Sequence, residues 1–131
     1  MLADILNMIG REPAQALSYA QKAMRLDPKH PGLYASAIGL AYLGMGRYRE
    51  AVDALRVAEV AQPNDPGIHT SLCYAYTQLG RDQDAQAEAA EVTRAAPGFT
   101  VEMLKKSLPG TEWNTPDNRH FLDGLRKAGL K

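Results

Sequence analysis

The side chains best suited to catalysis or metal binding are three histidines and one cysteine, scattered along the chain. His30, His69 and His120 lie far apart, and none has a histidine, cysteine or carboxylate partner at the spacing of a metal-ligand motif. We therefore expect each histidine to be a surface or groove residue. Cys73 precedes Tyr74 in a predicted helix, where a buried, inert thiol is expected rather than a nucleophile. The sequence thus predicts no metal site and no cofactor.

Glycines at positions 39, 44 and 46 raise the possibility of a phosphate-binding loop. Such a loop requires a Lys-Ser or Lys-Thr pair after its last glycine, whereas this chain continues with Arg47-Tyr48. The sequence also contains no convincing Ser-His-Asp or Cys-His arrangement and no pair of carboxylates for metal-dependent nucleotide chemistry. We therefore expect no catalytic residues, and a chain that is not itself an enzyme.

Composition limits the class of protein. The 131 residues suffice for one domain, and 45% apolar and 23% charged residues are typical of a globular chain. Fifteen basic and fifteen acidic side chains give zero net charge, which argues against nucleic-acid binding. Apolar runs fall far short of the roughly 20 residues that cross a bilayer, and no signal segment opens the chain. A single cysteine suits a reducing environment, so we expect a cytoplasmic protein.

Apolar residues recur at three- and four-residue steps, which predicts helices. The predicted helices cover residues 13–26, 31–43, 48–61, 66–79 and 82–95. Asp65-Pro66 reads as a helix cap followed by a first-turn proline. Turns of two to five residues make neighbouring helices antiparallel, and no segment alternates like a strand.

Several identities recur at an offset of 34 positions. The pairs are Tyr42 and Tyr76, Gly46 and Gly80, Arg47 and Arg81, Ala51 and Ala85, and Pro63 and Pro97. We expect the glycines to take a left-handed or otherwise tight conformation at the turn within each helix pair. The alanines should lie where the two helices cross closely, and the prolines should end the second helix.

This period resembles that of the tetratricopeptide repeat family. The resemblance implies an all-α fold in which antiparallel helix pairs form a short right-handed superhelix with a C-terminal capping helix. One domain would span 1–131, with a partial repeat at 1–30, repeats at 32–65 and 66–99, and terminal helices at 100–131. The usual tryptophan of the family is missing, since Ala35 and His69 stand at its position.

The tail is predicted to cap the array, because the last helix pair otherwise exposes a face that would meet another repeat. Residues 100–107 read as the first helix of an unfinished repeat, with Val101, Leu104 and Leu108 continuing the core. A final helix should begin at Thr115-Pro116 and end at Gly129. Its apolar stripe consists of Phe121, Leu122 and Leu125, and Phe121 and Leu125 are the expected anchors.

A narrower resemblance covers nearly the whole chain. HPGLYASAIGLAYLGMGRYREAVDAL, RAAPGFTVEMLKKSLP and the ending FLDGLRKAGLK are similar to the C-terminal repeat region of bacterial class III adenylate/guanylate cyclases. The same region occurs in some bacterial winged-helix regulators. The resemblance implies a part of a longer signalling protein whose catalytic domain lies earlier. Residues 110–115 depart from the more acidic linker expected there.

The family register also indicates a binding surface, because the first helix of each pair lines the concave face. The residues expected on this face are Leu33, Ser36, Leu40 and Leu43 from one repeat, and Thr70, Tyr74, Thr77 and Gln78 from the next. This face is apolar at one end and polar but uncharged at the other. It would bind a protein, a peptide or a second copy of the chain by apolar contact. Alternatively, the terminal helices of the chain cover it.

Two function classes follow from these features. The first is a non-catalytic interaction or regulatory module attached to a cyclase-like signalling protein. The second keeps the same fold without a cyclase, as a free-standing scaffold or as the repeat region of a transcriptional regulator. Sequence patterns within the chain do not separate them.

Overall fold

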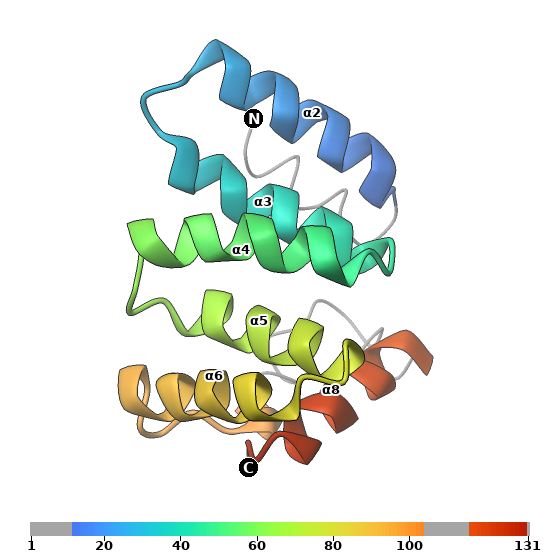
Figure 1. Ribbon diagram of the computed structural model, residues 1–131, viewed down its shortest axis with the longest axis vertical. Coiled ribbons are helices and arrows are strands. Elements are labelled where there is room, and N and C mark those ends of the chain that lie inside the picture. Colours follow the sequence, from blue (N-terminus) through green and yellow to red (C-terminus); the bar gives the residue numbers. More distant parts are fainter. Residues whose placement is uncertain (1–11, 104–115, 131) are drawn as a thin grey trace.

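From residue 13 to residue 95, the helices of this protein stack in chain order as antiparallel neighbours (Figure 1). The computed structural model describes residues 12–103 and 116–130, without the side chains of residues 31, 33, 116–118 and 121. The long helices of the described ranges are α2 (Pro13–Leu26), α3 (Pro31–Gly44), α4 (Tyr48–Ala61), α5 (Pro66–Gln78), α6 (Asp82–Ala95) and α8 (Pro116–Lys127). Residues 101–103 are also helical, and the described ranges contain no strand. The predicted all-α fold of stacked helix pairs is confirmed, and the bounds of the five predicted array helices agree within one residue.

The turns inside the two complete helix pairs have the same backbone geometry. Gly46 has a φ of 72° and Gly80 a φ of 74°, in the left-handed region that favours glycine. The amide of Arg47 donates to the carbonyl of Tyr42 at 2.9 Å, and the equivalent bond after Gly80 is also 2.9 Å long. This bond spans six residues, and a second bond runs from the glycine amide to the carbonyl three residues before it, at 3.1 Å for Gly46 and 3.2 Å for Gly80. Together they end each first helix and satisfy its last carbonyls. The predicted role of both glycines is confirmed.

The same turns explain why tyrosine and arginine share the 34-residue period. The guanidinium carbon of Arg47 lies 5.1 Å from the ring centroid of Tyr42, and that of Arg81 lies 4.8 Å from the centroid of Tyr76. These distances are typical of cation–π contacts. Each arginine thus packs over the helix end that its own backbone amide closes.

Small residues allow the paired helices to approach closely. Ala51 on α4 and Ala85 on α6 are both 0% exposed, as the repeat spacing predicts. A β-carbon on Gly39 of α3 would lie 2.5 Å from Cγ of Leu55 on α4, so no side chain fits at that crossing. Gly39 is therefore a packing residue rather than part of a phosphate loop.

The core runs through the array as two clusters. One joins α2 to α3 around Ala16, Ala20 and Ile38, and the other extends from α4 to α8 around Leu55, Leu72 and Tyr76. Tyr42 packs against both clusters and so connects them.

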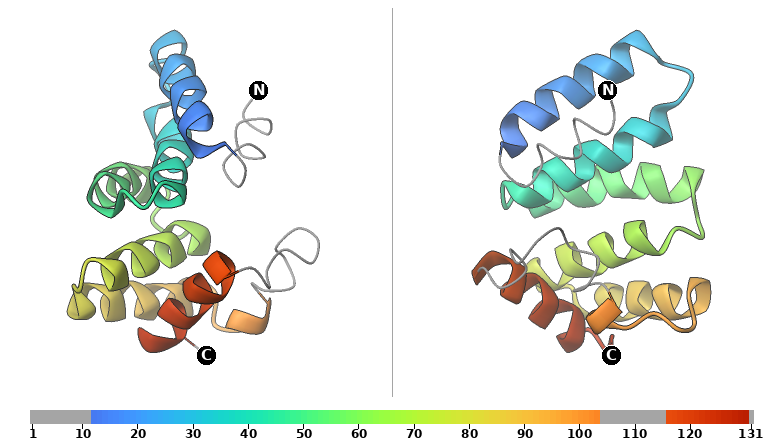
Figure 2. Two further views of the ribbon diagram at one scale, coloured as in Figure 1. Left: turned by 90° about the vertical axis from the view of Figure 1, so that its right-hand side faces the viewer. Right: turned by 180° about the vertical axis from the view of Figure 1, so that it is seen from behind.

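Helix α8 packs against α5 and closes the C-terminal part of the core (Figure 2). Leu122 is 3% exposed and Leu125 is 0% exposed, which agrees with the predicted apolar stripe. Val101 is fully buried in the same cluster. Gly129, with a φ of 110°, follows the helix as expected. The side chain of Phe121, together with Leu104 and Leu108, lies outside the described residues.

A matched pair of substitutions on α6 tests the helix crossing. Ala85→Leu should lower the free energy of unfolding by about 1–3 kcal/mol, because added methylenes overpack a filled core. Ala87, two residues along the same helix, is exposed, so Ala87→Leu should change it by less than about 0.5 kcal/mol. Urea denaturation followed by circular dichroism measures both, and equal losses would contradict this packing.

Truncation of Leu125 tests the contribution of α8. Leu125→Ala should cost roughly 2–5 kcal/mol, since it leaves a cavity beside α5. Leu26→Ala is the control, because Leu26 is 74% exposed. Thermal unfolding of the two variants reports the difference. Melting of Leu125→Ala at the temperature of the wild type would show that α8 does not stabilise the array.

Candidate functional site

The residues predicted to line the concave face lie on α3 and α5. Ser36, Leu40 and Leu43 are half-buried on α3, and Thr77 and Gln78 are half-buried on α5. Thr70 and Tyr74 of α5 are more enclosed, at 3% and 8% exposure. The side chain of Leu33 lies outside the described part of the structure. Because α8 lies against α5, the two ends of this face have different surroundings.

At the apolar end, the described residues line a cavity of about 350 Å³ that is partly open to solvent. It is lined by Ser36, Leu40, Leu55, Asp65, Pro66, Gly67, Ile68, Thr70, Ser71 and Phe99. Three polar groups of this lining are used internally. Thr70 and Ser71 donate to the carbonyls of Pro66 and Gly67, and Asp65 caps α5 by accepting from the Gly67 amide at 2.8 Å. The cavity therefore offers mainly apolar contacts to a ligand.

At the polar end, α8 occupies the face. Nε2 of His120 lies 2.7 Å from Oε1 of Gln78, and the His120 ring meets the ring of Tyr74 edge-on at 6.1 Å. A β-carbon on Gly124 would lie 3.1 Å from Oγ1 of Thr77 and 3.2 Å from Cδ1 of Tyr74. Helix α8 therefore lies over the Gln78 end of α5. His120 is a surface and groove residue, as predicted.

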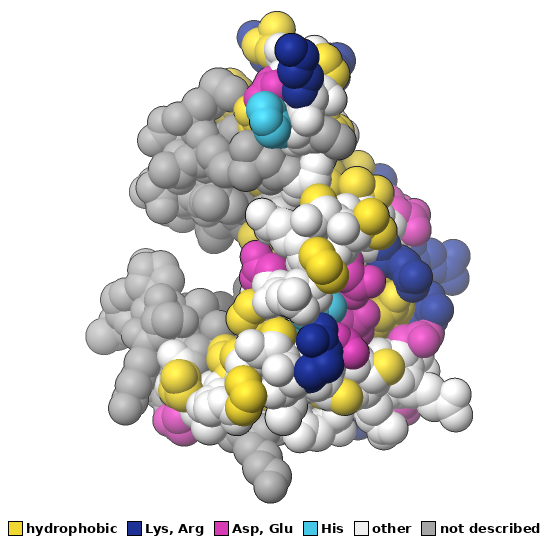
Figure 3. All heavy atoms as spheres, turned by 90° about the vertical axis from the view of Figure 1, so that its left-hand side faces the viewer, with side chains coloured by type: hydrophobic (Ala, Val, Ile, Leu, Met, Phe, Trp, Pro, Cys, Tyr) yellow, Lys and Arg dark blue, Asp and Glu magenta, His cyan; other side chains and the backbone are white. Residues whose placement is uncertain are grey.

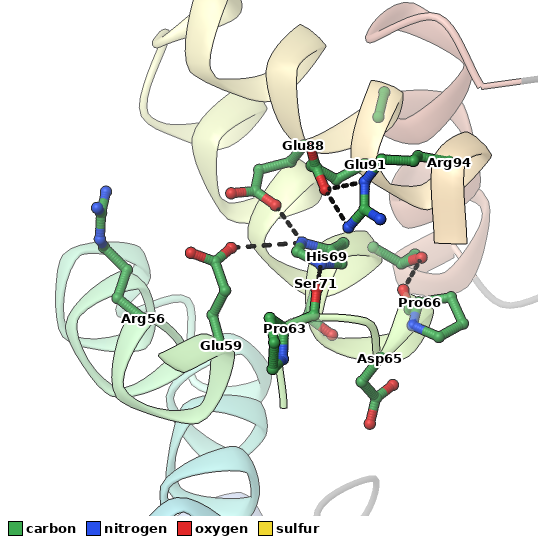
Figure 4. Close-up of polar contacts among 12 residues, drawn as sticks. Arg56, Glu59, Pro63, Asp65, Pro66, His69, Ser71, Glu88, Glu91 and Arg94 are labelled. Atoms are coloured by element: carbon green, nitrogen blue, oxygen red, sulfur yellow. Dashed lines mark hydrogen bonds and ion pairs between the residues drawn. The ribbon is translucent and has the colours of Figure 1, made fainter. Parts of the chain in front are cut away.

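A second group of polar residues, which sequence reasoning missed, lies on another face of the array (Figure 4). Nδ1 of His69 lies 2.7 Å from Oε2 of Glu88 on α6 and 3.3 Å from Oε2 of Glu59 on α4. Its Nε2 donates to the carbonyl oxygen of Pro63 at 2.6 Å. We call Glu59, His69 and Glu88 the Glu–His–Glu cluster. It joins three helices from two consecutive repeats.

The cluster corrects two predictions about His69. The residue is only 2% exposed and so is not a surface or groove residue. It also has carboxylate partners close enough to share a metal ion, since one ligand atom from each of the three residues lies within 4.8 Å of the others. Local spacing did not reveal them, because Glu59 and Glu88 lie 10 and 19 positions away on other helices. His30, by contrast, is exposed beside Asp27, as expected.

The repeat register did contain a signal for the burial of His69. His69 stands 34 positions after Ala35, and Ala35 is itself 4% exposed. A histidine at a repeat position that is buried must find polar partners, because an unpaired buried imidazole is costly. Comparing equivalent positions of the two repeats would have predicted a buried, hydrogen-bonded His69.

The cluster holds protons more tightly than its isolated groups would. Burial raises the pKa of Glu88 to about 7, with Glu59 adding to the increase and the hydrogen bond to His69 opposing it. Burial opposes protonation of His69, but the Pro63 carbonyl and the two carboxylates outweigh it, so the His69 pKa is raised. Cys73 is fully buried, and burial together with Glu88 raises its thiol pKa to about 12. The predicted burial of Cys73 is confirmed, and a raised thiol pKa disfavours the reactive thiolate.

Comparison with known proteins agrees with the helix-pair architecture. The model of the tetratricopeptide repeat family matches residues 10–70 and 42–108. The chain belongs to the tetratricopeptide repeat family. A similar relative is small glutamine-rich tetratricopeptide repeat-containing protein 2 of Mycosarcoma maydis, which is 30% identical over 94 residues. That match covers 72% of this chain and 26% of the relative, so the chain spans about a quarter of the relative's length.

Tetratricopeptide repeats bind other proteins or peptides, usually on the concave surface that the stacked helices create. In the part of this repeat protein that the structure describes, no helix has the length and apolar character needed to span a membrane. These comparisons do not show the resemblance to the repeat region of cyclases.

The pKa shifts predict how stability depends on pH. The folded chain binds more protons than the unfolded chain, because the folded pKa values of Glu88 and His69 are both raised. Their contribution to stability is therefore present at low pH and is lost as the pH rises through the folded pKa values. The Glu88→Gln variant lacks this titrating group. Between about pH 5 and about pH 8, its free energy of unfolding should therefore rise relative to that of the wild type by roughly 1–3 kcal/mol, since one pKa unit corresponds to about 1.4 kcal/mol.

Urea titrations at several pH values in the presence of a chelator measure this difference. Glu50→Gln is the matched control, because Glu50 lies outside the cluster and pairs with Arg47 at 3.1 Å. The free energy of unfolding of Glu50→Gln should follow that of the wild type across the pH range. Parallel pH profiles for Glu88→Gln and the wild type would contradict the shifted pKa of Glu88.

Proposed function

We propose that this chain is a non-catalytic interaction module that binds an apolar peptide segment or helix of a protein partner in the cavity between α3 and α5. The observation that carries the proposal is the cavity of about 350 Å³ beside Leu40, on the face that this family uses for recognition. Its volume falls within the roughly 300–1,000 Å³ typical of binding pockets. The proposed role of the chain is therefore binding and not catalysis.

The chemistry of the lining narrows the class of partner. Asp65 is the one charged side chain among the described residues of the cavity wall, and no lysine or arginine lines it. A clamp for an acidic peptide would need such cations. The lining therefore favours an apolar segment that is neutral or carries a positive charge near Asp65. Phe99 and Leu40 would supply the apolar contacts.

Two neighbouring roles belong to the same proposal. Self-association through the concave face would use the same cavity, with a second copy of the chain as the partner. Attachment to an adenylate/guanylate cyclase-like signalling protein is supported by the similarity of the 30–55 stretch and of the ending at 121–131. The alternatives are a free-standing scaffold and the repeat region of a transcriptional regulator. The gene sequence around this segment distinguishes them.

Further expectations about the setting of the chain remain proposals. A cytoplasmic location is supported by the free, buried thiol of Cys73. Exclusion of nucleic acid is supported by the balanced charge of the sequence. The division into a partial repeat at 1–30, repeats at 32–65 and 66–99 and terminal helices at 100–131 is supported by the 34-residue period.

Substitution of Leu40 tests the binding role. A displayed peptide library would be panned on the intact chain, and selected peptides measured by fluorescence anisotropy. Leu40→Lys should weaken binding at least roughly tenfold, since it places a charge in the centre of the cavity. Leu26→Lys is the control, because Leu26 is exposed on α2. Sedimentation of both variants reports self-association.

Unaltered peptide affinity in folded Leu40→Lys would contradict a site at this cavity. If the wild type is monomeric and the library yields no peptide that binds it, the proposed function is contradicted altogether. Far-ultraviolet circular dichroism of the variants confirms that a loss of binding does not reflect unfolding.

A further inference from the structure

The Glu–His–Glu cluster brings one imidazole nitrogen and two carboxylate oxygens within 4.8 Å of one another. The Nε2–H group of His69 is committed to the carbonyl oxygen of Pro63 at 2.6 Å. Its Nδ1 atom therefore faces two carboxylates, with Glu88 at 2.7 Å and Glu59 at 3.3 Å. Lone pairs on three such atoms repel one another unless a positive charge lies among them. Either an additional proton or a metal ion satisfies that condition.

We propose that Glu59, His69 and Glu88 form a binding site for a divalent transition metal ion of the zinc class. The site goes beyond the peptide-binding role and does not depend on it, since it lies outside the concave groove. Imidazole nitrogen and carboxylate oxygen are both ordinary ligands of Zn²⁺. The nitrogen ligand favours zinc and its neighbours over Mg²⁺ and Ca²⁺, which prefer sites made entirely of oxygen.

The distances suit a small tetrahedral ion. Bonds of about 2.0–2.1 Å place neighbouring ligand atoms of a tetrahedral zinc site roughly 3.3 Å apart. The separation of His69 Nδ1 from Glu59 Oε2 is 3.3 Å, and that from Glu88 Oε2 is shorter, at 2.7 Å. The shorter contact is the length of a charge-assisted hydrogen bond. A metal ion would replace that proton after the Glu88 carboxylate moves away from His69 by about 0.6 Å, from 2.7 Å to the tetrahedral spacing.

The surroundings of His69 are those of a metal ligand. Histidines that bind metals nearly always donate their other N–H group to a carbonyl or carboxylate, which fixes the ring and the tautomer. Pro63 provides that carbonyl from the short connection between α4 and α5. Because the ring is 2% exposed, packing also holds its orientation. The ligand on α5 is therefore positioned before any ion arrives.

The local charge also favours a cation. The cluster contains two carboxylates, and the two arginines near it have other partners. Arg94 pairs with Glu91 at 2.7 Å, and Arg56 donates to the hydroxyl of Tyr76 at 3.1 Å. Acidic and basic side chains gather midway along this face of the molecule (Figure 3). A divalent ion would offset the negative charge that these arginines leave in the cluster.

Access and coordination space are both present. A cavity of about 420 Å³ adjoins the cluster. Its described lining comprises Glu59, Val60, Pro63, His69, Glu88, Glu91 and Arg94. Three protein ligands leave the fourth position of a zinc ion to water, which this cavity can supply. Because Glu59, His69 and Glu88 come from α4, α5 and α6, the ion would join one repeat to the next.

Zinc titration of the intact, chelator-treated chain by isothermal calorimetry tests the proposal. We expect one Zn²⁺ per chain and a melting temperature that rises with zinc concentration. His69→Gln and Glu88→Gln should each weaken zinc binding by more than the roughly 10–100-fold that follows loss of an outer-shell partner. Glu59→Gln, which changes a partly exposed side chain, provides a third ligand variant less prone to unfolding.

Matched controls separate the cluster from general surface binding. His30→Gln removes an exposed histidine that has a single carboxylate partner, Asp27, and Glu50→Gln removes an exposed negative charge. Both should bind zinc as the wild type does. Absence of zinc binding, or equal affinity in the wild type and folded Glu59→Gln or Glu88→Gln, would overturn the proposal. Competition by an equal concentration of Mg²⁺ would overturn the assignment to the zinc class.

Discussion

Close approach of neighbouring helices at small residues determines the geometry of this protein. Ala51, Ala85 and Gly39 lie where paired helices cross, and each leaves no room for a larger side chain. The helix separation set there decides which side chains of α3 and α5 face the concave surface. It also decides how near α4 and α6 bring their glutamates to α5. Both the cavity beside Leu40 and the Glu–His–Glu cluster therefore depend on the same few contacts.

The helix pairs could be predicted from the sequence because their boundaries rest on local backbone chemistry. Prolines begin α2, α3 and α5, and left-handed glycines follow α3 and α5, so each signal acts within one turn of the residue that carries it. The 34-residue period then fixed the order of packing, since each repeat meets its neighbours in the same way. The fold could be predicted from the sequence because the residues that determine each helix end lie within about one turn of it.

The candidate sites were less predictable because they combine residues that no local pattern relates. The concave face followed from the repeat register, but its division by α8 depended on contacts of His120 and Gly124 with α5. The Glu–His–Glu cluster breaks the period, because Ala54 precedes Glu88 by 34 positions and Thr93 follows Glu59 by the same interval. A feature that occurs once in a repeat array is hidden from an argument based on repetition.

The position of α8 has a thermodynamic consequence for any partner that approaches the Gln78 end of the concave face. The helix is covalently joined to the array, so its local concentration there does not fall when the protein is diluted. An incoming ligand at that end must displace α8, so its apparent affinity is its intrinsic affinity multiplied by the fraction of molecules in which α8 is undocked. Ligands confined to the cavity beside Leu40 avoid this competition. A partner of the proposed kind would therefore meet different conditions at the two ends of this face.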